Sequence, residues 1–124
     1  MTILQRNSLA QLGHTLQDFS TLDRQRQYKS AVPFVHVPIE LIAQWDNHAR
    51  MVREVAWFAI LFSADELEAI ASFDALVNDA WLKMGPQLPD VPEILEDARW
   101  IQLSRDAGAL ARRLASSLST VTGN

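Results

Sequence analysis

The sequence of 124 residues contains no cysteine and only four glycines. Without cysteine the chain has no disulfide bond, no thiolate nucleophile and no Cys-ligated zinc site, which favours a reducing compartment. The scarcity of glycine argues against phosphate-binding loops, because such loops need bare backbone close to the ligand. No P-loop, Gly-x-Gly-x-x-Gly, Gly-x-Ser-x-Gly or His-Glu-x-x-His motif occurs. We therefore expect no cofactor, and an enzyme is the less favoured interpretation.

Long hydrophobic runs and excess positive charge are missing as well. The most apolar stretch, residues 55–62, is far too short to span a bilayer, and the first residues lack the apolar run of a signal peptide. The formal net charge is -4, whereas nonspecific binding to nucleic acid or to anionic membranes needs a positive surface. We therefore expect a cytoplasmic protein that binds neither nucleic acid nor membranes.

Helical periodicity is present in almost every segment. The length and the 48% hydrophobic content are typical of one globular domain. We therefore expect residues 1–124 to form a single all-α helical bundle of four to five helices, with a tail that frays from about residue 117. The first three helices are expected from Asn7 or Ser8 to about Gln27, from Pro38 to Phe62, and from a capping box at Ser63 and Glu66 to Gly85.

The last third of the chain allows two interpretations. Asp90 and Glu93 have the spacing of a capping box, but the apolar face of residues 91–118 changes midway. Either one long bent helix spans two neighbours, or the helix breaks near Ser104; we favour the long helix because no glycine or proline interrupts residues 104–106. Small residues that would let another helix approach closely, within the chain or across a dimer axis, are Ser104, Gly108, Ala111 and Ala115.

Charged residues in the second expected helix form a ladder. Asp46, Arg50 and Glu54 follow one another at i,i+4 spacing, which stabilises an exposed helix by about 0.2–0.5 kcal/mol per pair. Trp45 lies at the centre of the apolar stripe on the other side of the helix. We therefore expect Trp45 in the core and the three charged residues in solvent, and we predict no catalytic residues.

The sequence VAWFAILF, residues 55–62, is apolar at every helical angle. Such a segment is covered either by its own bundle or by another chain. Our first hypothesis is a non-enzymatic, bacterial-type interaction or regulatory protein that binds a protein partner, or itself as a homodimer, through an aromatic surface. The expected contact residues are Trp57, Phe58, Phe34 and Trp100, because aromatic side chains anchor interfaces.

The alternative hypothesis is a small-molecule-binding protein or enzyme. Two prolines favour extended backbone in residues 31–38, which we expect to form one Pro-flanked loop across the bundle. A pocket between this loop and the bundle would contain His36, His48 and Asp74. Asp74 lies close to an apolar helix face, so it is either half of a boundary ion pair, with Arg105 as first candidate partner, or a pocket acid. No histidine spacing matches a metal motif, and we expect no metal.

Overall fold

A computed structural model describes residues 1–122, most of which are helical. No strand occurs among these residues, so the prediction of an all-α fold is confirmed, although the helices outnumber the four to five expected. No helix in the described part is long and apolar enough to cross a membrane. The α-helices are α1 Ile3–Ser20, α2 Leu22–Ala31, α3 Val37–Glu54, α4 Ala56–Ala59, α5 Ala64–Met84, α6 Ala98–Arg113 and α7 Ala115–Thr122, and two 3-10 helices span Gly85–Gln87 and Glu93–Glu96.

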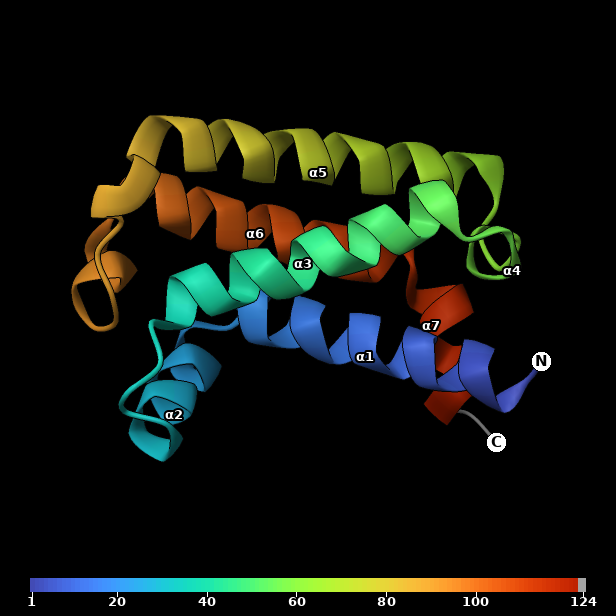
Figure 1. The fold of residues 1–124 in the computed structure, drawn as a ribbon, viewed down its shortest axis with the longest axis horizontal. Coiled ribbons are helices and arrows are strands. Elements are labelled where there is room, and N and C mark those ends of the chain that lie inside the picture. The colour runs from blue at the N-terminus through green and yellow to red at the C-terminus, as the bar shows by residue number, and fades with distance from the viewer. Residues whose placement is uncertain (123–124) are drawn as a thin grey trace.

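Four long helices form the body of the molecule (Figure 1). Both α1 and α5 contact α3 and α6, so the four helices surround a common core. The short helix α2 lies at one end, and α4 and α7 lie at the other end, close to the N-terminus (Figure 1). The connection between α2 and α3, residues 32–36, is a short turn in which the Val35 amide donates to the Val32 carbonyl at 3.1 Å.

Four aromatic rings, one from each long helix, occupy the centre of the core. Trp45 of α3 packs edge-to-face on Phe73 of α5 with 4.7 Å between the ring centroids, and Phe73 packs edge-to-face on Phe19 of α1 with 5.7 Å between the centroids. Phe19 stacks on Trp100 of α6 at 5.1 Å. Trp45 is fully buried, which confirms its prediction as core. Because these contacts join all four helices, they fix the relative positions of α3 and α5.

The start of α1 differs from the prediction. Thr2 caps the helix, in a capping box with Gln5, so the expected caps Asn7 and Ser8 are wrong and lie inside the helix. The missed signal is local, since a Thr-x-x-Gln sequence is also a capping box. The Gln5 side-chain amide additionally donates to the Trp57 carbonyl at 2.8 Å, which holds α4 against the first turn of α1.

The predicted continuation of the first helix to Gln27 is also wrong, because α1 ends at Ser20 and α2 begins anew. The buried side chain of Gln25 makes this corner stable. Its amide donates to the Phe19 and Asp18 carbonyls at 2.9 and 3.1 Å, so it satisfies two backbone acceptors at the end of α1. Its oxygen accepts a bond of 2.8 Å from the Trp100 indole.

Helix α3 ends at Glu54, whereas the sequence predicted one helix as far as Phe62. Val55 is extended, with φ -115° and ψ 102°. The break loses few backbone bonds, because the Val55 carbonyl accepts from the amides of Phe58 and Ala59 at 3.0 Å each. It turns Phe58 and Phe62 into the core, where their rings meet edge-to-face at 5.3 Å. The apolar run therefore divides into a buried side and an exposed side.

The predicted boundaries of α5 are confirmed. Ser63 and Glu66 form the capping box at its start, and Gly85 ends it with a φ of 59°. That value lies in the region where glycine has no steric penalty, which explains why the helix stops at this residue. Glu66 also accepts a hydrogen bond of 2.9 Å from the Ser117 hydroxyl, which ties α7 to the start of α5.

The predicted long helix over residues 91–118 is wrong, and so is the alternative break near Ser104. The chain instead forms a 3-10 turn, α6 and α7, and the α6–α7 break lies at Leu114. Asp97, not Asp90, caps α6 by accepting from the Trp100 amide at 3.3 Å and the Arg99 amide at 2.8 Å. Helix α7 continues to Thr122, whereas fraying was expected from about residue 117; residues 123–124 lie outside the described part.

The line of small residues on α6 packs within the chain at Gly108. A Cβ atom at Gly108 would lie 3.6 Å from the Cβ atom of Ser20 on α1, so the two helices approach closely there. Ser104, one turn earlier, is buried on the same helix. The close contact that the sequence predicted is thus made between α6 and α1.

Candidate protein-binding surface

His36 has two local partners at the start of α3. Its Nδ1 accepts from the Ile39 amide at 3.2 Å, which caps the helix, and its Nε2 donates to the Leu88 carbonyl at 2.9 Å. Beside it, the Lys29 ammonium contacts Asp90 at 2.6 Å. Burial alone would raise the pKa of Asp90, but the hydrogen bonds from Lys29 and from two backbone amides hold that pKa below its ordinary value. These residues fasten the α2–α3 turn to the segment before α6.

His48 lies on the side of α3 that faces α1. Its Nε2 is 2.9 Å from the Thr15 hydroxyl, and burial lowers the pKa of the imidazole from 6.5 to about 4. The ring is therefore neutral near pH 7. A small polar hollow of about 290 Å³ opens beside it and is lined by Gln11, His14, Thr15, Gln44, Asn47 and His48.

Asp74 lies on α5 and faces α3. It accepts hydrogen bonds from the Trp45 indole at 3.0 Å and the Asn78 amide at 3.4 Å, and it pairs with Arg53 at 3.1 Å. The predicted partner Arg105 is wrong, because Arg53 takes that place. His36, His48 and Asp74 thus do not converge on one pocket. No group of three or more metal-ligating side chains occurs among the residues that the structure describes.

The predicted contact aromatics do not form one surface. Phe58 and Trp100 are fully buried, so neither offers area to a partner. Trp57 is 36% exposed and Phe34 is 89% exposed. These two residues lie at opposite ends of the molecule, since Phe34 is in the α2–α3 turn and Trp57 is in α4 (Figure 1).

A groove between α3 and α5 contains two apolar hollows in line. One, which we call the Trp81 hollow, has a volume of about 330 Å³. The other, the Val52 hollow, has a volume of about 260 Å³. The Trp81 hollow is lined by Ile39, Ile42, Ala43, Trp45, Asp46, Val77, Asn78 and Trp81, and the Val52 hollow by Ala49, Val52, Arg53, Leu67, Ile70, Ala71 and Asp74. Together the two hollows form the α3/α5 groove.

Helical periodicity explains how both helices present these residues. The lining residues of α3 and those of α5 each recur at spacings of three and four along one helix face. The Trp45–Asp74 bond joins the two helices where the hollows adjoin, and the Arg53–Asp74 pair joins them at the Val52 hollow, so the groove has a fixed width there. Its rims carry the small residues Ala43 and Ala71, which leave the groove open to another chain.

Trp81 and Ile39 are the large side chains that sequence reasoning missed. Trp81 is 38% exposed and Ile39 is 39% exposed, and both line the same hollow. Trp81 shares an apolar face of α5 with Ile70 and Val77, both of which are buried, so the sequence indicated core for all three. Periodicity identifies a face, but it does not tell whether a neighbouring helix covers that face along its whole length.

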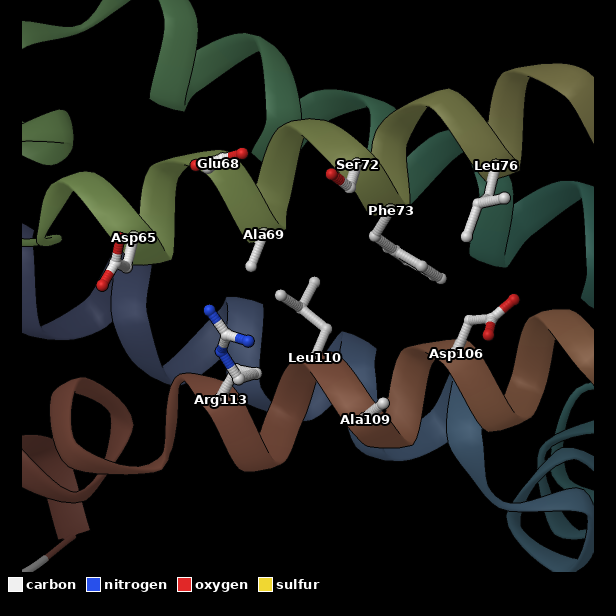
Figure 2. A pocket seen from close by; sticks show the side chains of 10 residues that line it. All are labelled: Asp65, Glu68, Ala69, Ser72, Phe73, Leu76, Asp106, Ala109, Leu110 and Arg113. Atoms are coloured by element: carbon white, nitrogen blue, oxygen red, sulfur yellow. The ribbon is translucent and has the colours of Figure 1, made fainter.

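A second groove lies on the other side of α5, against α6 (Figure 2). At about 410 Å³ it is larger than either single hollow of the α3/α5 groove, but its rim is charged. Figure 2 shows Phe73 and Leu110 between the helices, with Asp65 and Glu68 on the α5 side and Arg113 on the α6 side. Mixed charges around a floor of core residues are typical of a solvated helix boundary. We therefore take the α3/α5 groove, whose lining is more apolar, as the candidate binding surface.

Comparison with known proteins identifies no relative: no protein-family model, curated protein or solved structure matches this chain. Its function therefore has to be inferred from its own residues. The α3/α5 groove offers apolar area, an exposed indole and a carboxylate that already has its hydrogen-bond partners. That combination is suited to binding a polypeptide.

Proposed function

We propose that this chain is a non-enzymatic protein-binding domain that holds an apolar polypeptide segment in the α3/α5 groove. The observation that carries the proposal is the alignment of two apolar hollows beside the exposed side chains of Trp81 and Ile39. Partly exposed aromatic residues next to a recess are typical anchors of protein interfaces. The cytoplasmic location and the bacterial origin stay predictions.

The dimensions of the groove match an amphipathic helix. Its lining residues span 39–53 on α3 and 67–81 on α5. At 1.5 Å per residue, either span corresponds to roughly 20 Å, or about four helical turns. A helix laid in a groove of this kind presents side chains at i, i+3, i+4 and i+7, and it would fill the two hollows in turn.

The polar residues of the groove support recognition and not chemistry. Asp74 accepts from Trp45, Arg53 and Asn78, and its side chain is largely covered. Three hydrogen-bond donors hold this carboxylate in one position. Asp74 thereby keeps α3 and α5 at a fixed separation, so the groove is already formed before a partner binds.

A small-molecule site or enzyme between residues 31–38 and the bundle is the weaker alternative. His36 caps α3, His48 of α3 faces α1, and Asp74 of α5 faces α3, so the three residues of that hypothesis lie in three different environments. The four hollows described above do not include one lined by residues 31–38.

The test uses a displayed library of amphipathic helical peptides selected for binding to the purified chain. Ala71→Trp would fill the Val52 hollow from an exposed position on α5. Ala109→Trp is the matched control, because Ala109 is also exposed and lines the α5/α6 groove of Figure 2. Circular dichroism verifies that both variants retain the helical fold.

We expect selected peptides to lose at least about tenfold in affinity, or about 1.4 kcal/mol, for Ala71→Trp and to bind Ala109→Trp as they bind the wild type. Loss of binding in Ala109→Trp alone would move the site to the α5/α6 groove. Failure to select any peptide that is sensitive to Ala71→Trp would contradict the proposed function.

A further inference from the structure

We infer that the natural occupant of the α3/α5 groove is a second copy of this chain, packed antiparallel about a two-fold axis near the middle of α3. The inference rests on the proposed function, because it names the partner of the same groove. It draws on three features of the chain: the order of charges along α3, the position of an exposed apolar projection, and the position of the larger apolar hollow of the groove.

The charges in the groove are self-complementary under a two-fold rotation. Asp46 lines the Trp81 hollow and Arg53 lines the Val52 hollow. The two are seven residues apart on α3, which corresponds to roughly 10 Å along the helix axis. In an antiparallel pair whose axis passes midway between them, Asp46 of each copy faces Arg53 of the other.

Both charged groups have capacity for such a contact. Asp46 is exposed and forms no ion pair within the part of the chain that the structure describes. Arg53 pairs with Asp74 through one terminal nitrogen only, and 54% of its side chain is exposed. A guanidinium has five N–H donors, so Arg53 can bind a second carboxylate without releasing the first.

The apolar features are complementary as well. Trp57 and Ile60, which is 78% exposed, follow directly after the C-terminal end of α3. The Trp81 hollow, with Ile39 at its rim, lies at the N-terminal half of the same helix. Antiparallel packing brings the C-terminal end of one α3 beside the N-terminal end of the other. An apolar projection of each copy is therefore placed next to an apolar recess of its partner.

A second copy satisfies these requirements without any further assumption about a partner. A helix from another protein would have to supply a basic side chain for Asp46 and an acidic side chain for Arg53. It would also need apolar side chains to cover Trp57 and Ile60. The chain itself carries all of these groups in the reverse order. Exposed apolar groups of this size are disfavoured in monomers, and closed two-fold association is the commonest way of covering them.

The experiment is sedimentation equilibrium of wild type, Asp46→Arg, Arg53→Asp, and an equimolar mixture of the two variants. Each variant alone places like charges opposite each other at both pairs, whereas the mixture restores both opposite-charge pairs. Arg112→Asp, which changes the same charge on an exposed residue of α6, is the control. Because Arg53→Asp also breaks the pair with Asp74, Trp57→Ala provides a second variant that leaves this pair intact.

We expect a wild-type dimer that Arg112→Asp leaves unchanged. Asp46→Arg, Arg53→Asp and Trp57→Ala should each weaken dimerisation at least about tenfold, and the mixture of the two charge variants should recover it. A mixture that associates no better than its components overturns the proposed pairing. If Arg53→Asp does not fold, full dimerisation of Trp57→Ala overturns it instead.

The outcomes separate this inference from the proposed function. The wild type could stay monomeric while its groove binds peptides, with this binding abolished by Ala71→Trp. That result refutes the second copy as occupant and retains the protein-binding groove. If the Ala71→Trp variant dimerises as strongly as the wild type, and the wild-type groove binds no peptide, both the inference and the proposed function are refuted.

Discussion

Acidification should destabilise the folded chain through His48. Burial lowers the pKa of this imidazole from 6.5 to about 4. Below pH 6.5 the unfolded chain binds a proton that the folded chain does not bind until about pH 4. The free energy of unfolding therefore falls as the pH decreases through this window, and the loss is complete below it. At about 1.36 kcal/mol for each unit of pKa difference, the loss amounts to roughly 3 kcal/mol.

The measurement is urea unfolding of wild type and His48→Gln at a series of pH values from about 7 to about 4. Glutamine retains a polar group beside Thr15, which lies 2.9 Å from the imidazole, but it does not titrate. Carboxylates such as Asp90, whose pKa is lowered in the folded state, also lose stabilising interactions in acid. That loss is common to both proteins, so the difference between the two curves isolates His48.

We expect the wild type to lose roughly 3 kcal/mol more than His48→Gln between the two ends of the pH range, with a steepest additional slope of about 1.36 kcal/mol per pH unit. The two curves should be parallel above pH 7, where His48 is neutral in both states. If they stayed parallel throughout, the imidazole would not be buried against α1, and the placement of α3 on α1 would be wrong.

Three further substitutions test the packing of α3 and its neighbours. Trp45→Ala removes the indole from the aromatic core and should cost roughly 3–5 kcal/mol in urea unfolding. Trp100→Phe keeps an aromatic ring but removes the indole donor to buried Gln25, and should cost roughly 1–3 kcal/mol by the same measurement. Arg50→Ala removes an exposed side chain bonded only to Asn47, so its melting curve should show a loss under about 1 kcal/mol.

The elements that the sequence predicts well are those with local signals. The capping box of Ser63 and Glu66 lies within one helical turn, and Gly85 supplies the positive φ that ends α5. The burial of Trp45 follows from the 3.6-residue period of α3. In each case the residues that decide the structure are neighbours in the sequence.

The breaks at Val55 and Leu114 have no such signal, because neither glycine nor proline stands at them. At Val55 the gain comes from rings that the bend turns into the core, and this gain depends on what the rest of the chain places there. The same holds for Asp74, whose partners Trp45 and Arg53 are 29 and 21 residues away in the sequence. Long-range contacts of this kind require the assembled fold.

The α3/α5 groove is equally invisible to periodicity. Val77 and Trp81 lie on one face of α5, yet Val77 is buried and Trp81 borders an open hollow. The difference arises because α3 covers only part of this face. The sequence predicted an exposed aromatic residue at Trp57, which is 36% exposed, and did not predict one at Trp81.

The most direct test of the binding groove is a nitrogen–proton correlation spectrum of the labelled chain, recorded with and without a saturating peptide from the selection. The proposed binding groove predicts shifts of the Trp81 indole and of the Ala43 and Ala71 amides, which border it. The amides of Ala109 and Arg113, in the groove between α5 and α6, should stay in place. Shifts confined to Ala109 and Arg113, with Trp81 unchanged, would contradict it.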